Sequence, residues 1–393
     1  MKFSFASLLI LFSAATAAQG VQTQEQALMQ DAAQYAARYG VTGGEALRRL
    51  HAQQASVQVT EGIAREFQSR LAGISIEHSP EYRIVVLLTG NEPVQDRTAA
   101  GVPVLFRTGA PATRDQAIAA LRKHLIDLRS ELPAARGAGY DQRTGKVVLL
   151  VTSADVERFG LDTIRTRAEQ LSGVPVRVQV NELIEQNMTV GGGGRVEGVN
   201  TQTGRRNVCT SGFVVTDGSR NGLATAAHCP DEISYLDPES GNLSLPFVGQ
   251  WGLGYQDVQI NLSDQASAPL FHADRGADSL RRVVTWRNRD STRAGEFVCH
   301  FGESSGYSCS EVELTDYAPP DGLCGGPCSP TWITVRGPSC IPGDSGGPVF
   351  VGEVALGLAK GINRAPTGQC NFYYYMSADY LPPPWRLMTS PAI

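Results

Sequence analysis

The sequence predicts an α+β N-terminal half followed by an all-β C-terminal half. Up to about residue 190, helical periodicity alternates with short β-rich runs. Beyond that point helical periodicity nearly vanishes, and short apolar runs are separated by Gly, Pro, Asn and Asp. Four consecutive glycines, Gly191 to Gly194, are typical of a flexible junction between the two halves. A chain of 393 residues also exceeds one typical core, so we expect at least two domains.

The first residues are typical of a secretory signal. Lys2 precedes an apolar stretch from Phe3 to Phe12, and small residues end in Ala15-Thr16-Ala17-Ala18, an A-x-A cleavage site. A membrane anchor is the alternative, but the stretch is far shorter than the roughly 18 residues that a spanning helix needs. We therefore assign residues 1–18 to a signal peptide and expect a secreted protein, extracellular or periplasmic, without a membrane partner.

The N-terminal half reads as alternating helices and strands without an active-site motif. Its expected elements are, in order, helices 24–39 and 44–70, a strand at 82–88, a helix from the cap Thr113 to Leu132, a strand at 147–151, a helix at 154–171 and a strand at 174–180. The last three suggest a small βαβ layer. His51, His78 and His124 have no ligand-like spacing, so we interpret each as a surface or packing histidine.

The C-terminal half reads as short strands. The apolar runs lie at 212–216, 258–262, 283–286, 332–335 and 349–358. Regular short strands with turn signals indicate a sandwich or a barrel, and the pattern alone does not choose between them.

Composition limits the partners and the compartment. The formal net charge is −5 and no basic cluster stands out, so the chain lacks the electrostatic footprint of a nucleic-acid binder. All eight cysteines follow Val208, and cysteines in an exported chain suggest disulfides. Only the C-terminal half therefore looks built for oxidising surroundings.

Two motifs carry the chemistry, Gly343-Asp344-Ser345-Gly346-Gly347-Pro348 and Thr225-Ala226-Ala227-His228-Cys229. The glycines let the backbone turn sharply at the serine and aim nearby N–H groups at one point, which can hold an oxyanion. Taken alone, the first motif could be an ordinary Gly-rich turn. Acyl transfer, however, needs a hydroxyl, a base and a group that orients the base, and the histidine motif supplies the base.

Ser345 is the candidate nucleophile, His228 the candidate base and Asp257 the candidate orienting carboxylate. Asp257 is preferred because residues 258–262 alternate like a strand that leads from it into the core. The competing carboxylates lack this context; they are Asp264, Asp274 and Asp278.

The order His, Asp, Ser is that of chymotrypsin-type serine proteases. Two further segments, Cys209 to Thr216 and the Cys299-His300-Phe301-Gly302 hairpin that ends in Gly306-Tyr307-Ser308-Cys309, resemble the bacterial branch exemplified by α-lytic protease and the streptogrisins. The resemblance covers roughly the last half of the chain. It implies a double six-stranded antiparallel β-barrel at residues 189–393, preceded by an α+β pro-region at residues 19–188.

The same resemblance implies a role for each site residue. His228 would act as general base and then acid, Asp257 would orient it, and Ser345 would be the nucleophile. The N–H groups of Gly343 and Ser345 would form the oxyanion hole, and Asp344 would hold that loop. No metal and no organic cofactor is implied.

Eight cysteines allow 105 pairings, and sequence alone does not choose among them. The resemblance implies Cys209–Cys229, Cys299–Cys309 and Cys340–Cys370. It leaves Cys324 and Cys328, whose Gly-Gly-Pro linker could bring them within bridging range. A metal site at these two cysteines is the alternative, although structural zinc usually takes four protein ligands.

Two positions depart from the family pattern. His300 stands where an arginine normally pairs with the aspartate before the nucleophile. We hypothesise that His300 donates to Asp344; the alternative is an exposed histidine, with the aspartate held by another group. If the protonated histidine is the partner, the oxyanion loop weakens as pH rises through the histidine's titration.

The second departure is the segment Ala359-Lys360-Gly361-Ile362, where the family usually has a Ser-Gly-Gly type sequence. By position, Lys360 falls near a serine that touches the triad carboxylate, and Ile362 near a glycine that leaves the specificity pocket open. No acidic residue stands just before Cys340, where the sequence has Pro338 and Ser339. We therefore expect Ser339, Lys360, Gly361 and Ile362 to form the substrate-binding region, with small or medium apolar side chains preferred before the cut bond and Arg or Lys disfavoured.

The sequence thus predicts a secreted serine endopeptidase made as a zymogen, acting on proteins or peptides and monomeric after processing. A barrel of non-local strand pairs folds slowly, and the resemblance implies that the pro-region assists folding and blocks the site until it is removed. An independent binding domain is the alternative for that half. A protease-like pseudoenzyme that binds peptides without cleaving them, prompted by Lys360 and Ile362, is the alternative function.

Overall fold

The computed structural model describes residues 22–131, 137–180, 184–187, 194–201, 204–237, 241–263, 266, 268–273, 280–337 and 339–390. The predicted signal peptide, the glycines before Gly194 and the expected boundary between residues 188 and 189 lie outside the described residues, as do Asp264, Asp274 and Asp278. No helix in the described part of the chain is long and apolar enough to cross a membrane.

Three helices open the described chain: α1 (Gln24–Tyr39), α2 (Gly43–Ala55) and α3 (Val57–Glu66). Helix α1 begins at a capping box made by Thr23 and Gln26, and ends at Gly40 with φ of +65°. The single helix expected at 44–70 is wrong, because the chain breaks at Ser56, whose hydroxyl donates to Gln53 O. Such side-chain bonds compete with helical continuation.

Two small sheets follow. The first has the order β1-β2-β4-β3, built from β1 (Leu71–Glu77), β2 (Arg83–Thr89), β3 (Arg97–Ala99) and β4 (Val102–Ala110). The second has the order β5-β6-β7, built from β5 (Gly137–Asp141), β6 (Lys146–Val151) and β7 (Val176–Val180), with helices α4 (Arg114–Glu131), α5 (Ser153–Phe159) and α6 (Leu161–Ser172).

The expected βαβ layer is present, since β6 and β7 pair in parallel and α5 and α6 connect them. Its helix is nevertheless divided in two. Gly160, with φ of +80°, separates α5 from α6, where the periodicity of the sequence suggested one continuous helix.

Six strands of the C-terminal half close into a barrel, because β24 pairs with strands at both ends of the sheet. The ring runs β24 (Val354–Arg364), β23 (Pro348–Val351), β20 (Phe297–Gly302), β21 (Gly306–Tyr317), β22 (Trp332–Arg336) and β25 (Cys370–Ser377). Two short strands add to β24: β19 (Thr285–Trp286) in parallel and β8 (Ile184–Asn187) antiparallel. The expected run 349–358 is therefore two strands, divided at Gly352.

The remaining strands form separate sheets. A four-stranded sheet has the order β10 (Arg206–Thr210), β9 (Arg195–Val199), β13 (Ile233–Asp237), β14 (Gly241–Leu245). A five-stranded sheet has the order β15 (Phe247–Trp251), β16 (Val258–Leu262), β12 (Asn221–Thr225), β11 (Val214–Thr216), β26 (Arg386–Leu387). A two-stranded pair, β17 (Leu270–His272) and β18 (Leu280–Arg282), and short 3₁₀ turns at Arg289–Ser291 and Ala378–Tyr380 complete the fold. One closed barrel is thus observed, and the predicted second barrel is not confirmed.

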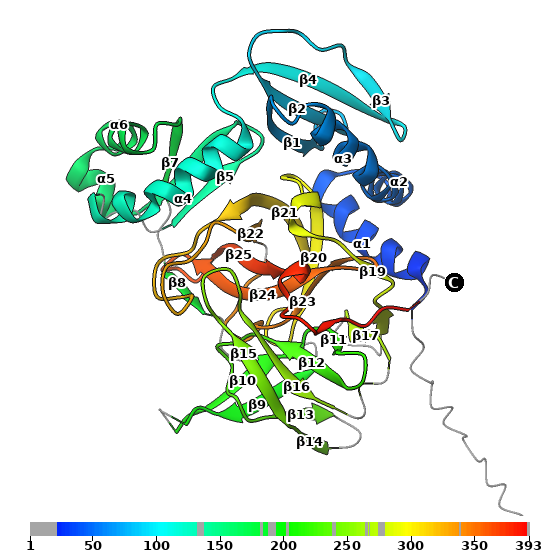
Figure 1. Cartoon of the computed structure of the whole chain (residues 1–393). Coiled ribbons are helices and arrows are strands. Elements are labelled where there is room, and N and C mark those ends of the chain that lie inside the picture. The colour runs from blue at the N-terminus through cyan, green and yellow to red at the C-terminus, as the bar shows by residue number, and fades with distance from the viewer. Residues whose placement is uncertain are drawn as a thin grey trace, which may run out of the picture.

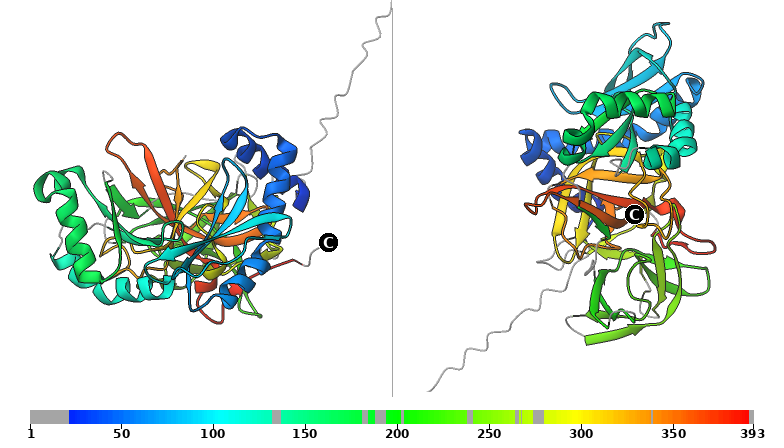
Figure 2. Two further views of the ribbon diagram at one scale, coloured as in Figure 1. Left: turned by 90° about the horizontal axis from the view of Figure 1, so that it is seen from above. Right: turned by 90° about the vertical axis from the view of Figure 1, so that its left-hand side faces the viewer.

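The closed barrel lies between the N-terminal elements on one side and the four-stranded and five-stranded sheets of the C-terminal half on the other (Figures 1 and 2). One hydrophobic cluster continues from the N-terminal helices into the barrel: it includes Leu28 and Tyr35 of α1, Leu50 of α2 and Phe297 of β20. The N-terminal half therefore shares a core with the C-terminal half in the full-length chain.

Candidate active site

His228, Asp257 and Ser345 form one hydrogen-bonded row. His228 Nδ1 lies 2.8 Å from Asp257 Oδ2, and His228 Nε2 lies 2.8 Å from Ser345 Oγ. Asp257 and Ser345 are buried, at 3% and 0% exposure, and the side chain of His228 is 13% exposed. Asp257 lies 29 positions and Ser345 117 positions from His228 in the sequence. The fold thus brings together the three residues that sequence reasoning selected.

Strand register explains why the histidine meets the aspartate. In the antiparallel pair β12–β16, Thr225 lies opposite Gln259. His228 follows Thr225 by three residues and Asp257 precedes Gln259 by two, so both side chains leave the same end of this pair. The Cys209–Cys229 disulfide links the turn that carries His228 to β10.

The serine turn packs tightly against β10 and β12. Thr210 N–H donates to Ser345 O at 2.6 Å. Gly346 has φ of +84°, and a Cβ atom there would lie 2.3 Å from Thr225 Oγ1 and 2.4 Å from Thr210 O. A larger residue at position 346 would therefore push the serine away from the strand that leads to His228.

Two amides beside Ser345 are available to a ligand. Among the described residues, the N–H groups of Gly343 and Ser345 donate to no backbone carbonyl, whereas Gly346 N–H donates to Ala359 O and Gly347 N–H to Asp344 O. Gly343 has φ of +134°, a conformation that side-chain-bearing residues rarely adopt. This geometry can supply donors to a developing oxyanion.

Asp344 is held mainly by backbone. Its Oδ1 accepts from Ser305 N–H at 3.0 Å, and its Oδ2 lies 3.5 Å from Ile341 N. His300 Nε2 is 3.7 Å from Asp344 Oδ2, which is an ion-pair distance but too long for a hydrogen bond. The hypothesised donation from His300 is therefore not observed in this geometry.

His300 is fully buried, so the alternative of an exposed histidine is wrong. Its Nε2 lies 3.2 Å from Ser305 Oγ and its Nδ1 3.2 Å from Ser308 Oγ. The hairpin of β20 and β21, closed by Cys299–Cys309, thus brings Ser305 both to His300 and to the loop of Asp344.

Lys360 contacts the same carboxylate oxygen as the histidine. Its Nζ lies 3.3 Å from Asp257 Oδ2, and its side chain is 1% exposed. Burial alone raises the pKa of Asp257, but His228 and Lys360 outweigh burial and leave that pKa below its ordinary value. Burial lowers the pKa of Lys360, and Asp257 opposes the effect. Lys360 therefore lies against the carboxylate, near which the resemblance had placed it, and its part in substrate binding stays a prediction.

The neighbouring residues of β24 pair with the segment before the expected boundary. Gly361 lies opposite Asn187 and Ile362 opposite Gln186, in an antiparallel register. The side chain of Ile362 is fully buried, and Ser339 is partly exposed next to Cys340. A strand edge that accepts an extended segment in this way can also accept a peptide.

All eight cysteines are paired. The disulfides are Cys209–Cys229, Cys299–Cys309, Cys324–Cys328 and Cys340–Cys370, the three pairs that the resemblance implies together with the pair left over. With both sulfurs in a disulfide, Cys324 and Cys328 do not offer the thiolates that a metal site there would need.

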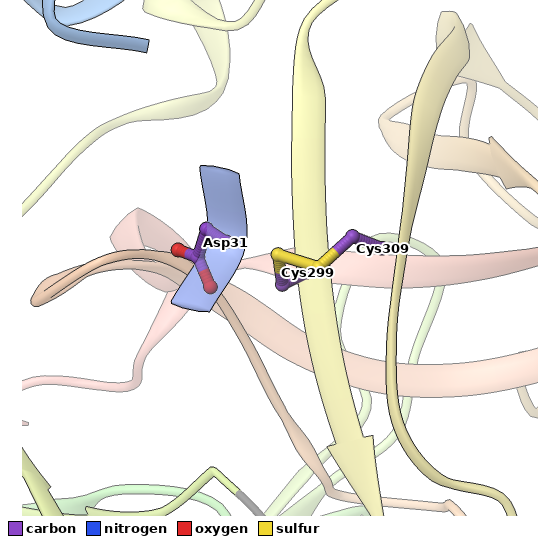
Figure 3. Close-up of side chains that lie close together, drawn as sticks. All are labelled: Asp31, Cys299 and Cys309. Atoms are coloured by element: carbon purple, nitrogen blue, oxygen red, sulfur yellow. A yellow bond between two sulfur atoms is a disulfide. The ribbon is translucent and has the colours of Figure 1, made fainter. Parts of the chain in front are cut away.

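A cluster with metal-like spacing within the described residues, Asp31 beside Cys299 and Cys309, is also not a metal site (Figure 3). Both sulfurs form a disulfide. The carboxylate of Asp31 is occupied: Arg281 Nη1 and Gly352 N–H donate to it at 3.0 and 2.6 Å, and Tyr307 OH donates as well.

Sequence reasoning missed this cluster, which joins α1 to the barrel. Asp31 and Arg281 are 250 residues apart and almost completely buried. Further buried contacts between the halves include Arg293 with Gln53 O and Ser56 Oγ, Arg114 with Asp316, and His78 with Gly295 O. A sequence signal for such pairs does not exist in one chain, because each partner alone resembles an ordinary surface residue.

Comparison with known proteins places this geometry in context. No protein-family model matches the chain. Streptogrisin-C of Streptomyces griseus is 27% identical over 156 residues, which cover 39% of this chain and 32% of that protein. Serine protease 1 of Streptomyces fradiae is 24% identical over 313 residues, 79% of each chain. The solved structure of Thermobifida fusca protease A matches at 20% identity with a TM-score of 0.39, over 51% of this chain and 98% of that one.

The match thus spans about a third of streptogrisin-C and most of Serine protease 1. Together with the histidine and serine motifs, these two sequence relatives make the chain similar to bacterial serine proteases of the streptogrisin kind.

Proposed function

We propose that the chain is the precursor of a secreted serine endopeptidase that cleaves peptide bonds through an acyl-enzyme. The observation that carries this proposal is the row of Asp257, His228 and Ser345, with both hydrogen bonds at 2.8 Å. A nucleophile within reach of a base, and a base within reach of a buried carboxylate, is the arrangement that activates an alcohol.

Each step uses a group in this row. His228 Nε2 takes the proton of Ser345 Oγ as the oxygen attacks the peptide carbonyl carbon, and the carbonyl oxygen gains negative charge. The amides of Gly343 and Ser345 donate to that oxyanion, while Asp257 stabilises the imidazolium. The imidazolium then gives its proton to the amine nitrogen, the C–N bond breaks, and the amine departs while the acyl group stays on Ser345 Oγ. Water, deprotonated by His228, attacks the ester and restores Ser345.

Labelling by a fluorophosphonate tests this function, since only an activated serine reacts with it. We expect the processed protein to label at Ser345 and to lose label when His228 is replaced by alanine. Peptide binding without any labelling would instead favour the pseudoenzyme.

We propose that residues 19–188 are a pro-region that keeps the enzyme inactive. Two observations support this role: β8, at residues 184–187, occupies the edge of β24 where a substrate would pair, and Ser345 is fully buried in the full-length chain. Removal of the segment, by cleavage at the proposed boundary of residues 188 and 189, would free that edge for other peptides.

The contact between the halves should weaken in acid. His78 is buried between Tyr35 and Gly295 O, and burial lowers its pKa below the ordinary 6.5, although Gly295 and Glu311 oppose the shift. The docked state thus favours neutral His78, so its contribution to docking is complete above pH 6.5 and is lost as pH falls. Burial raises the pKa of Glu311, but Tyr39, His78 and Arg38 leave it below 4.5, so acid weakens this contribution too.

We therefore expect the separated pro-region to bind the protease domain more weakly at about pH 5 than at about pH 7.5. Isothermal titration with a Ser345→Ala protease domain measures this change. His78→Gln should flatten most of it between these two pH values, and His51→Gln, at an exposed position on α2, should not. A binding constant that is equal at both pH values would contradict the assignment.

We propose that the enzyme prefers small or medium apolar side chains before the cut bond. Ile362 lies on the edge of β24 that pairs with β8. Its side chain leaves less room than a glycine would for the substrate side chain before the cut bond. In a peptide library, kcat/KM should be about 10–200-fold higher for Ala, Val, Leu or Met than for Arg or Lys. Ile362→Gly should raise kcat/KM for larger side chains, and preferential cleavage after Arg would refute the proposal.

A further inference from the structure

Lys360 is a buried cation that, within the described part of the chain, pairs with the carboxylate of Asp257. Its Nζ lies 3.3 Å from Asp257 Oδ2, the oxygen that also faces His228 Nδ1 at 2.8 Å. Lys360 and Asp257 are 1% and 2% exposed at their side chains. The carboxylate oxygen of the proposed triad is therefore shared between an imidazole and an ammonium, inside the protein, where charges interact strongly.

The fold holds the ammonium in place from the opposite side. Lys360 Nζ lies over the ring of Trp332 at 5.1 Å from its centroid, and Trp332 Nε1 donates to Gly254 O. Gly254 precedes Asp257 by three residues, and Asp257 N–H donates to Met376 Sδ of β25. Three barrel strands thus contribute residues around the carboxylate of Asp257: β22 contributes Trp332, β24 contributes Lys360 and β25 contributes Met376.

The choice of lysine at this position is specific. Of the 34 basic residues in the chain four are lysines, and Lys360 is the one that follows residue 146. Elsewhere the buried cations of the described chain that pair with carboxylates are arginines, as at Arg281 and Arg293. An ammonium is a compact point charge, whereas a planar guanidinium needs room for a fork of donors.

We propose that Lys360 is a positioning residue of the triad: its ammonium fixes Asp257 and offsets part of the carboxylate charge that faces His228, so that the enzyme stays active at lower pH than it would without Lys360. This inference rests on the proposed function of His228, Asp257 and Ser345. It adds a role that a serine at the corresponding position, with no charge, does not supply.

The electrostatic reasoning is direct. A lone carboxylate stabilises an adjacent imidazolium, which makes the imidazole take up a proton at higher pH. A cation on the same carboxylate oxygen reduces that stabilisation of the imidazolium. This matters for activity because a protonated histidine does not serve as a base. The charged groups that act on Asp257 are His228 and Lys360, and the charged group that acts on Lys360 is Asp257. The ring of Trp332 on β22 also lies beside the ammonium, and on β25 the residues opposite the neighbours of Lys360 are Tyr374 and Tyr375.

The test replaces Lys360 by methionine, which keeps the volume of the stem and removes the charge. In the processed enzyme we expect the acidic limb of the kcat/KM profile to move up by about one pH unit in Lys360→Met. Arg220→Met removes an exposed cation that pairs with Asp217, so it is the control and should leave the limb in place. An acidic limb that coincides in the wild type and Lys360→Met would overturn the inference.

A second measurement covers variants that fail to mature. In the full-length chain with Ser345→Ala, an NMR titration of the His228 ring should have its midpoint at higher pH when Lys360 is methionine. Equal midpoints would also overturn the inference. Failure of the proposed function gives a different result, because a wild-type protein that neither cleaves peptides nor labels with a fluorophosphonate has no acidic limb to compare.

Discussion

Replacing Ser345 by alanine should reduce peptide hydrolysis by a factor on the order of 10⁵ to 10⁶ in kcat, as expected for the loss of the nucleophile from a triad that works as a unit. The variant keeps His228 and Asp257 but has no hydroxyl at 2.8 Å from His228 Nε2. Hydrolysis of a chromogenic peptide by the purified processed form measures the effect. Because Ser345 is fully buried and its methylene remains, we expect the variant to fold.

Ser219→Ala is the matched control, since Ser219 lies in an exposed loop and contacts Asp217. It should retain wild-type hydrolysis. Ser345→Ala should also accumulate as the unprocessed precursor if the enzyme removes its own pro-region. Hydrolysis by Ser345→Ala at a rate near that of the wild type would exclude Ser345 as the nucleophile.

Replacing Asp31 by alanine should be the most damaging single change at the contact between the two halves. Arg281 would remain buried without its carboxylate, and Tyr307 and Gly352 would lose their acceptor. Breaking a buried ion pair from one side costs about 3–5 kcal/mol, which corresponds to a binding constant weaker by about 10² to 10⁴-fold. Titration of the separated pro-region against a Ser345→Ala protease domain measures this loss.

Arg38→Ala is the control on the same helix, because the Arg38–Glu311 pair is exposed by 33% and 20% and should contribute at most about 1 kcal/mol. If the pro-region assists folding, Asp31→Ala supplied in trans should also recover less active enzyme from refolding residues 189–393 than the wild-type pro-region does. Circular dichroism of each isolated pro-region checks that α1 itself is intact. Equal effects of the two substitutions would show that the buried pair does not dominate the contact.

The sequence predicted the local elements of this fold where periodicity is strong. The helix at 24–39 and the strand at 258–262 agree with α1 and β16 residue for residue. The errors occur where one residue breaks a continuous pattern, as Ser56 and Gly160 do within expected single helices. Hydrophobic periodicity continues across such a break, so it does not report the break itself.

The candidate site was predictable because its residues stand in motifs that chemistry constrains. His228 and Ser345 are embedded in small residues that a tight turn requires, and Asp257 precedes a recognisable strand. The resemblance placed Lys360 near the carboxylate, but the sequence did not predict that its ammonium would pair with Asp257 Oδ2. The buried pair of Asp31 and Arg281 was not predictable, because it depends on how two distant surfaces meet.

The short strand β26, at residues 386–387, supplies an edge to the sheet that carries the histidine turn. Its partner β11 lies at residues 214–216, about 170 positions earlier in the order of synthesis. A ribosome releases the N-terminal side of a chain first, so the five-stranded sheet lacks this edge strand until residues 386–387 have emerged. A chain interrupted before these residues would leave the backbone groups of β11 on that side without their strand partner.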